Sequence, residues 1–301
     1  MTTNRIEAEL PRINVKGRGV PSQTWYVIRR YPVLPAIVLI AVAFAAIFGP
    51  LLTTYDPQFG DLSAQVTPPF WNEGGSTAHL LGTDALGRDL VARLLYGARL
   101  SLTIAGIVLV TGGATGTLLG MIAGYFSGWI DEAIMRFVDL TLGVPFILVA
   151  LVAVIVFGAS LELIIVLLVI FSWSGFARQV RAETIRLKEM EYIAYANLSG
   201  ASTVRIFGRH ILPGVFNTVL VIATLQVGSL IIAESSLSFL GVGIPAPKPA
   251  WGVMVADGRN FVSIAYWIAL FPGLAIFLLS YALNFIGDWT RDRLDPRLRQ
   301  I

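Results

Sequence analysis

The stretch EYIAYANLSGASTVRIFGRHILP, Glu191 to Pro213, is a polar interruption between two strongly apolar blocks of the chain. Its first half, up to Ser199, consists of good helix formers, and Gly200 is a typical residue at a helix C-terminus. A second helical turn is expected through Arg209. Pro213 then suits the first turn of a following helix, because that position needs no N–H donor. The stretch predicts two short helices, joined at a glycine and connected stiffly to an apolar helix.

The composition of the whole chain is that of a membrane protein. Of its 301 residues, 55% are hydrophobic and 14% are charged, and its mean hydropathy is +0.73. Soluble domains carry roughly 25% charged residues. A net charge of +3 gives no reason to expect nucleic-acid binding, and the absence of cysteine excludes disulfides and thiolate metal sites.

Apolar runs long enough to cross a bilayer, about 20 residues each, predict six membrane spans. The segment from Leu140 to Ala177 is too long for one span, and Gly158 to Ser160, followed by Glu162, supplies a turn that divides it. We therefore expect an all-α integral membrane protein with a transmembrane domain over residues 32–287. The six spans are expected at about 32–52, 100–126, 138–158, 162–178, 211–234 and 261–286.

Lysine and arginine in the connecting segments predict the orientation of these spans. With the N-terminus inside, seventeen Lys and Arg residues fall on the inner side and five on the outer side. Because cytoplasmic loops are enriched in positive charge, both termini and the stretch quoted above are expected to be cytoplasmic.

The remaining segments are expected to lie at or outside the membrane surface. Residues 1–31 read as an uncleaved cytoplasmic tail, in which SQTWYVIRRY at 22–31 predicts an interfacial helix, since aromatic and cationic residues suit the headgroup zone. Residues 288–301 read as a cytoplasmic tail. Residues 53–98 form a long outer loop, and residues 241–260 a second one, in which the prolines of GIPAPKPAW favour extended or turn structure.

The quoted stretch resembles a loop found in the permease subunits of ABC importers. That loop is written EAA, three residues, Gly, about nine residues, I-x-L-P. Ala194, Tyr195 and Ala196 align with EAA, Gly200 with the glycine, and Leu212 and Pro213 with LP. Ala194 replaces the glutamate of the pattern, so a salt bridge from that glutamate to the ATPase is either absent or supplied by Glu191. His210 replaces the isoleucine of the pattern. The HILP form resembles the peptide-transporting branch.

This resemblance implies that residues 186–210 form a cytoplasmic coupling loop whose helix fits a groove on an ATPase subunit. Independently, Tyr192, Tyr195, Ala196 and Ser199 have the spacing of one helix face, and exposed tyrosines are typical of a partner surface. The alternative is a solvated connector without a partner. The expected coupling residues are Glu191, Tyr192, Ala194, Tyr195, Ala196, Gly200, Ala201, Ser202, Leu212 and Pro213.

Two further motifs and the late NFIGDWTRDRLDPRLR resemble the C-type permease of dipeptide, oligopeptide and nickel importers. The motifs are GTDALGRDLVARLLYGARLSL, Gly82 to Leu102, and AESSLSFLGVGIPAPKPAWG, Ala233 to Gly252. The resemblance implies a type I importer in a bacterial or archaeal cytoplasmic membrane. Its other parts would be a B-type permease, two ATPases that bind ATP and magnesium, and an extracytoplasmic peptide-binding protein.

No catalytic role or cofactor is expected on this chain itself. It has no GxxxxGK[ST] phosphate loop, and the glycines of TGGATGTLLG, Thr111 to Gly120, are expected to let helices pack closely. His79 and His210 are the only histidines and are expected on opposite sides of the membrane, which argues against a metal or catalytic cluster. The functional alternatives are a nickel importer of the same family and, in another class, an ATP-independent channel or secondary transporter.

Two polar groups have competing interpretations. Glu234, with Ser235 and Ser238, is expected near the outer end of the fifth span. It could line an outer gate and meet the amino group of a peptide, or it could make a structural hydrogen bond to a neighbouring helix or loop. Asp84, Arg88 and Asp89 could form a local ion pair and turn that shapes a docking surface, or could contact the binding protein directly.

Overall fold

The structure, a computed structural model, describes residues 32–294. Within this range the regular elements are helices, and an isolated bridge pairs Thr83 with Asp89. The predicted interfacial helix at 22–31 and the last part of the predicted C-terminal tail lie outside the described residues.

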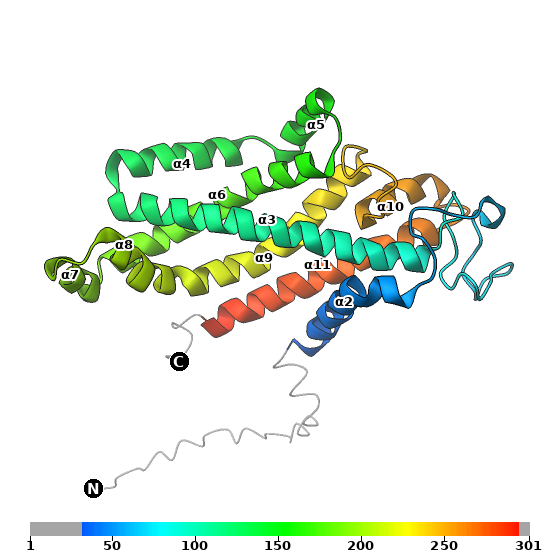
Figure 1. Ribbon diagram of the computed structural model, residues 1–301, viewed down its shortest axis with the longest axis horizontal. Helices are drawn as coiled ribbons and strands as arrows, with labels where there is room; N and C mark the ends of the chain where they lie inside the picture. The colour runs from blue at the N-terminus through cyan, green and yellow to red at the C-terminus, as the bar shows by residue number, and fades with distance from the viewer. Residues whose placement is uncertain (1–31, 295–301) are drawn as a thin grey trace, which may run out of the picture.

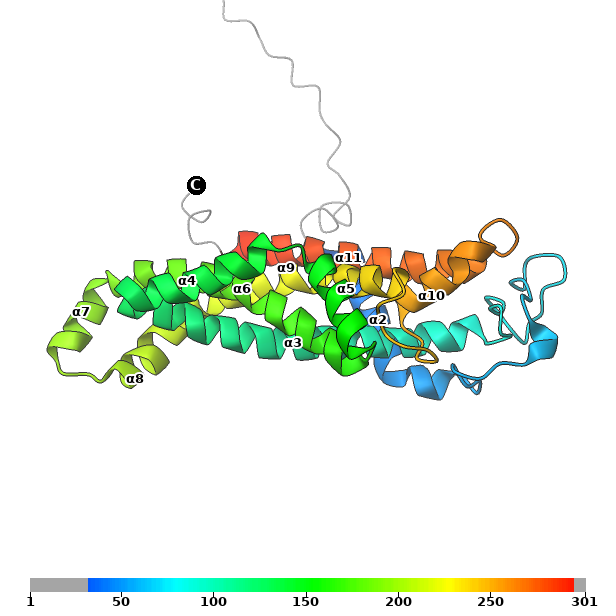
Figure 2. The same cartoon turned by 90° about the horizontal axis from the view of Figure 1, so that it is seen from above.

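Five long helices form the body of the molecule, and α3, α6, α9 and α11 run beside one another along its long axis (Figures 1 and 2). Each of the five is long and apolar enough to cross a membrane. Their bounds are Val33–Leu52 (α2), Leu90–Phe126 (α3), Leu161–Lys188 (α6), Leu212–Phe239 (α9) and Trp267–Leu294 (α11).

The remaining predicted span is not a straight helix. Two helices, α4 (Gly128–Gly143) and α5 (Phe146–Phe157), are bent by 83° relative to one another. The prediction of one continuous helix over 138–158 is therefore wrong. The cause is local: Pro145 cannot donate a hydrogen bond and disfavours helical backbone at the residue before it, and Val144 is extended at φ −102° and ψ 128°. Counted as one span, the pair brings the number of crossings to six.

Several helices extend beyond the predicted spans. Helix α3 begins at Leu90 rather than residue 100, α6 continues to Lys188 rather than 178, and α9 continues to Phe239 rather than 234. Helix α11 begins only at Trp267 and continues through Leu294, so the first part of the predicted C-terminal tail is helical. Hydropathy marks the part of a helix that lies in lipid, whereas its ends depend on caps. At the start of α3, the Asp89 side chain accepts a hydrogen bond from the Ala92 N–H at 2.8 Å.

Opposite ends of the molecule carry the two conspicuous non-spanning regions. One end, here called the tip end, carries the short helices α7 (Glu191–Leu198) and α8 (Thr203–Ile206) (Figure 1). The other, the loop end, carries residues 53–89 and α10 (Trp251–Gly258). Sequence analysis predicted an outer loop at 241–260, with extended or turn structure for its proline-rich run, and did not predict α10. The helix forms directly after the proline-rich run, and the Trp251 indole N–H donates to the Leu94 carbonyl at 3.0 Å, which fastens α10 to α3.

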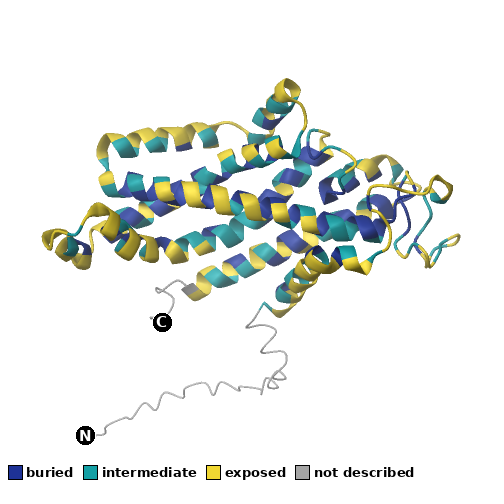
Figure 3. Ribbon diagram, in the orientation of Figure 1, coloured by how far each residue is buried: buried dark blue, intermediate teal, exposed yellow. Residues whose placement is uncertain are grey.

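Glycines pack α3 closely against α6. A Cβ atom at Gly116 would lie 2.3 Å from the Trp173 carbonyl oxygen, and one at Gly120 would lie 2.6 Å from the Ala177 carbonyl oxygen. Neither position therefore accepts a larger residue without separating the two backbones. The predicted packing role of these glycines is confirmed. Figure 3 shows the resulting distribution, with buried residues between the long helices and many exposed ones on α4 and α7.

Candidate functional site

Helices α7 and α8 form a helix–glycine–helix projection at the tip end (Figure 1). Gly200 has φ +76°, in the left-handed region that favours glycine. Around it the Gly200 N–H donates to the Asn197 carbonyl at 3.0 Å and the Ala201 N–H to the Ala196 carbonyl at 3.1 Å. These bonds close the end of α7 as in a Schellman-type cap. Ser202 then caps α8, because its hydroxyl accepts from the Arg205 N–H at 3.4 Å. The predicted glycine stop and second helical turn are confirmed.

An apolar anchor attaches this projection to the body. Ile193 of α7, Ile206 of α8 and Ile211 are each at most 1% exposed. They pack in one cluster with side chains of α3, α6 and α9, namely Met121, Val180, Leu187 and Val215. Burial of an isoleucine side chain contributes about 2 kcal/mol, so three of them hold the short helices firmly. The projection is thus a fixed part of the molecule rather than a loose loop.

The outward surface of the projection carries aromatic and apolar side chains among polar ones. The exposed fractions are 45% for Tyr192, 66% for Tyr195, 84% for Leu198 and 82% for Val204. The exposure of the two tyrosines follows the sequence prediction, but Ala196 is partly buried against the anchor, because it lies three residues after Ile193 on the same side of α7. Leu198 and Val204 were not predicted, although apolar residues on both sides of Gly200 in a polar segment were a visible signal. We call Tyr192, Tyr195, Leu198 and Val204 the tip surface.

The other predicted coupling residues border this surface. Glu191 and Ala194 are exposed on α7, and the ring of Tyr192 lies 5.9 Å from that of His210. Pro213 lies in the first turn of α9, as predicted. A π-helical turn, Phe207–Ile211, joins α8 to α9, so helical backbone runs without interruption from Thr203 to Phe239. The stiff connection that the sequence predicts between the second short helix and the following span is therefore a continuous helix.

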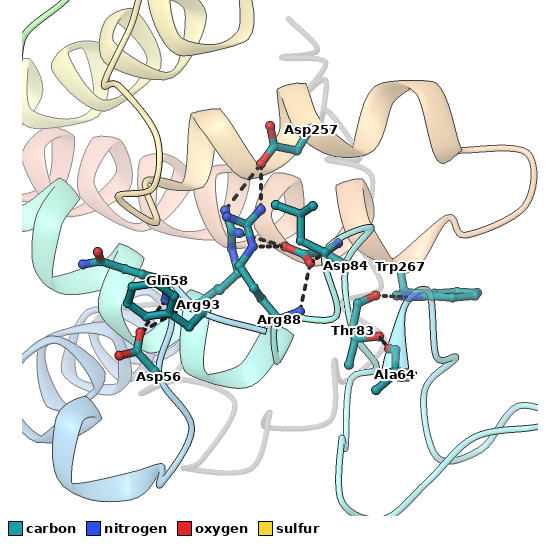
Figure 4. A network of polar contacts seen from close by, with 11 residues as sticks. Asp56, Gln58, Ala64, Thr83, Asp84, Arg88, Arg93, Asp257 and Trp267 are labelled. Carbon is teal, nitrogen blue, oxygen red and sulfur yellow. Dashed lines mark hydrogen bonds and ion pairs between the residues drawn. The ribbon is translucent and has the colours of Figure 1, made fainter. Parts of the chain in front are cut away.

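A second polar site lies at the loop end, around Asp84 (Figure 4). Asp84 Oδ2 accepts hydrogen bonds from Arg88 Nε and Arg93 Nη1, both at 2.7 Å. The Nη2 groups of both arginines lie 3.4 Å from Asp257 Oδ2 on α10. Partial burial raises the pKa of Asp257 above its ordinary value, and the two arginines oppose that shift. The network ties the long loop, the start of α3 and α10 together.

The predicted local ion pair and turn are therefore present, but these side chains are not exposed. Asp84, Arg88 and Asp89 are 3%, 6% and 4% exposed, and Arg93, which sequence analysis missed, is 1% exposed. Asp89 caps α3 and lies 2.9 Å from His79 Nδ1. The three predicted residues shape the loop from within, and a role of the loop in docking stays a prediction.

Glu234 is enclosed within the chain. It is 2% exposed, the Ser238 hydroxyl donates to its Oε1 at 2.7 Å, and the Ser235 hydroxyl lies 3.5 Å from its Oε2. Its partners thus lie on its own helix, not on a neighbouring one as the structural alternative expected. A cavity of about 10 Å³, which Ser101 also lines, adjoins Glu234 between α3, α6 and α9. This geometry favours a structural role, and contact with a peptide stays a prediction.

Known proteins resemble this chain in sequence, and a solved structure resembles it in fold. The family described as "Binding-protein-dependent transport system inner membrane component" matches residues 116–300. The glutathione transport system permease protein GsiD of Pectobacterium atrosepticum is 42% identical, over 87% of this chain and 85% of that protein. The dipeptide transport system permease protein DppC of Alkalihalophilus pseudofirmus is 41% identical over 87% of this chain and 84% of that protein. The di/tripeptide permease DppC of Pseudomonas aeruginosa is 39% identical over 87% and 86%.

Among solved structures, an inward-facing MetNI methionine ABC transporter matches with a TM-score of 0.54 and 18% identity, over 67% of this chain and 97% of the matched one. At this identity the likeness concerns the fold alone. The chain thus belongs to the binding-protein-dependent transport system inner membrane component family and has the all-helical fold of an ABC importer permease.

Proposed function

We propose that the chain is the permease subunit of an ATP-driven importer of dipeptides and oligopeptides, forming half of the translocation pathway. Its relatives at about 40% identity are named for dipeptide, di/tripeptide and glutathione transport. The observation that carries the proposal is the tip surface, which presents two tyrosines and two apolar side chains on a buried anchor. Aromatic and apolar side chains exposed on a rigid support are typical of a protein-binding surface.

The tip surface is proposed to fit a cytoplasmic ATPase subunit. ATP and magnesium would bind to that partner, while this chain contributes no catalytic group. When two ATPase subunits close on ATP, the projection docked on one of them moves with it. Ile193 and Ile206 fix the projection to the body and so pass the movement on. The continuous backbone from Thr203 to Phe239 carries the displacement into α9, which changes the side from which the pathway is open.

The complete importer is proposed to contain a B-type permease, two ATPases and an extracytoplasmic peptide-binding protein, in a bacterial or archaeal cytoplasmic membrane. In this arrangement both termini and the tip end face the cytoplasm, and the loop end faces the binding protein. The names of the relatives reported above give no support to the nickel alternative. If the chain were an ATP-independent channel or secondary transporter, the tip surface would have no partner protein to bind.

The test is reconstitution of the chain with its cognate partners in proteoliposomes. We expect ATP-dependent uptake of labelled dipeptides, no uptake of nickel, and ATP hydrolysis only when the ATPase subunits are present. Membrane preparations of the chain without those subunits are the matched control. Dipeptide uptake at the same rate without the ATPases would refute the proposal in favour of a self-contained transporter.

A further inference from the structure

The span formed by α4 and α5 is broken at a place where lipid would require regular helix. Helix α4 ends at Gly143, α5 begins at Phe146, and their axes diverge by 83°. The last carbonyl groups of one helix and the first N–H groups of the next have no partner within their helices. In a membrane, irregular backbone is tolerated only where protein covers it or where it lines a water-filled cavity.

This break lies near the middle of the bilayer. The ring of Phe146, at the start of α5, lies 4.9 Å from that of Phe171 on α6. Along α6, the charged residues that flank the apolar part are Glu162 toward the loop end and Arg178 toward the tip end. At about 1.5 Å per residue, Phe171 is about 14 Å from Glu162 and about 10 Å from Arg178. The break is therefore far from either headgroup layer.

The surface around the break is open and carries charge. Leu142 and Val144 are 50% and 47% exposed. One turn before the break, the side chain of Asp139 is 63% exposed, and it pairs with that of Arg178, which is 52% exposed. Because Arg178 marks the tip-side end of the apolar part of α6, this pair lies at the edge of the region around the break and not at its centre. We call Asp139, Leu142, Val144 and Arg178, with the backbone between α4 and α5, the break surface.

We propose that the break surface lines the translocation pathway and hydrogen-bonds the backbone of a passing peptide; this inference rests on the proposed function. A peptide carries amide groups and termini of opposite charge. The carbonyls of the last turn of α4 would attract N–H donors and an ammonium group. At the start of α5 the Leu148 and Val149 N–H groups donate to the Pro145 carbonyl, so those of Phe146 and Ile147 would attract carbonyls and a carboxylate. The pair Asp139 and Arg178 offers both signs of charge on the tip side.

A permease–permease contact is the competing explanation for an exposed break, and the charges argue against it. Burying Asp139 and Arg178 at a subunit interface would remove both from water, and the desolvation cost of such a pair commonly equals or exceeds its attraction. In a water-filled pathway the pair keeps its hydration. The side chains of Leu142 and Val144 would keep binding weak enough for a peptide to leave.

The absence of cysteine from the chain makes a direct test possible. Val144→Cys and Leu142→Cys would each be assembled into the importer in proteoliposomes and treated with a negatively charged methanethiosulfonate reagent. Ile37→Cys is the control, because Ile37 is 58% exposed on α2, where every exposed residue is apolar. Only a thiolate reacts, and a thiol needs water to ionise, so we expect the break cysteines to react at least about tenfold faster than Ile37→Cys.

Addition of the binding protein, ATP and dialanine should slow the reaction at the break cysteines and leave Ile37→Cys unchanged. Reaction as slow as that of Ile37→Cys at both break positions, with and without ATP, in a complex that still imports dialanine would overturn the inference and assign the break to a covered interface. The proposed function would survive that result. Failure of the cysteine-free complex to import any dipeptide would instead count against the proposed function, and this inference would fail with it.

Discussion

At the scale of single residues, Gly200 offers a direct test of the proposed contact between the tip surface and a partner. It has φ +76°, and a Cβ atom built there would meet nothing within 4 Å. A side chain at this position therefore meets no obstacle in the isolated chain, and its left-handed backbone adds strain of about 1 kcal/mol. An arginine at residue 200 would project from the end of α7 beside the tip surface.

We expect Gly200→Arg to reach the membrane at a normal level, to lose the ATPase subunits on purification and to abolish peptide uptake. Gly158→Arg is the matched control, because Gly158 has φ +81° and equally open surroundings but lies between α5 and α6, away from the tip end. Membrane level, co-purified ATPase and uptake are measured for both variants. Wild-type uptake by Gly200→Arg would mean that the projection is only a connector.

At the scale of the elements, the network around Asp84 holds the loop end together. Asp84 is buried and balances Arg88 and Arg93, while Asp257 is more distant and partly exposed. Removing the charge of Asp84 leaves two buried guanidinium groups with one weak partner, and breaking a buried ion pair in this way costs about 3 kcal/mol.

Asp84→Asn is therefore expected to lower the melting temperature of the purified protein and its level in the membrane. Glu132→Gln is the control, since the pair of Glu132 with Arg136 is mostly exposed, at 69% and 75%, and such pairs contribute less than about 1 kcal/mol. Equal melting temperatures for the two variants would show that the network does not stabilise the loop end.

Sequence patterns predicted those elements whose determinants are local. Hydropathy located the spans, Gly200 marked the end of α7, and the spacing of Asp84 and Arg88 predicted their pair. The distant partner of Arg93 was out of reach, because Asp257 is 164 residues away and only the packing of α10 on α3 brings the two side chains together. Gly143 and Pro145 did signal a break, but the apolar run around them matched a continuous span equally well. Hydropathy shows that a segment is apolar enough to lie in lipid, but it does not show whether the backbone of that segment is a regular helix.

Glu234 shows the same limit of sequence-based prediction, because its enclosure depends on how distant helices pack. Its position near one end of a span was readable, but a carboxylate on an apolar helix can face a pathway or the interior of its own subunit. The rotation of α9 against α3 and α6 decides between the two, and that rotation depends on the fit of side chains from all three helices. Within the tip surface, the exposure of Tyr192 and Tyr195 was predictable, because the two share one face of a helix in a polar segment, whereas Leu198 and Val204 were missed.

At the scale of the whole molecule, the packing of α3 on α6 determines how many times the chain crosses the membrane. Four glycines of α3 face α6: in chain order, Gly112, Gly116, Gly120 and Gly124 face residues 172, 173, 177 and 181. Because the order is the same on both helices, α3 and α6 run in the same direction. Between the end of α3 and the start of α6, the chain must therefore return from the tip end to the loop end. Only α4 and α5 connect them, which makes the bent pair a crossing and not a re-entrant loop.

With six crossings we expect both termini on the same side, and the excess of lysine and arginine predicts that this side is the cytoplasm. A reporter that is active only in the cytoplasm should therefore be active when fused after Ile301 and inactive when inserted within residues 67–78. The decisive fusion is at Gly158, between α5 and α6. If the pair α4 and α5 crosses the membrane, this reporter is inactive, like the one in residues 67–78. If the pair instead returned to its starting side, the Gly158 reporter would be active, the crossings would number five, and the parallel packing of α3 and α6 would be impossible in a membrane. Protease protection of the same fusions in sealed vesicles provides an independent measurement of the side on which each one lies.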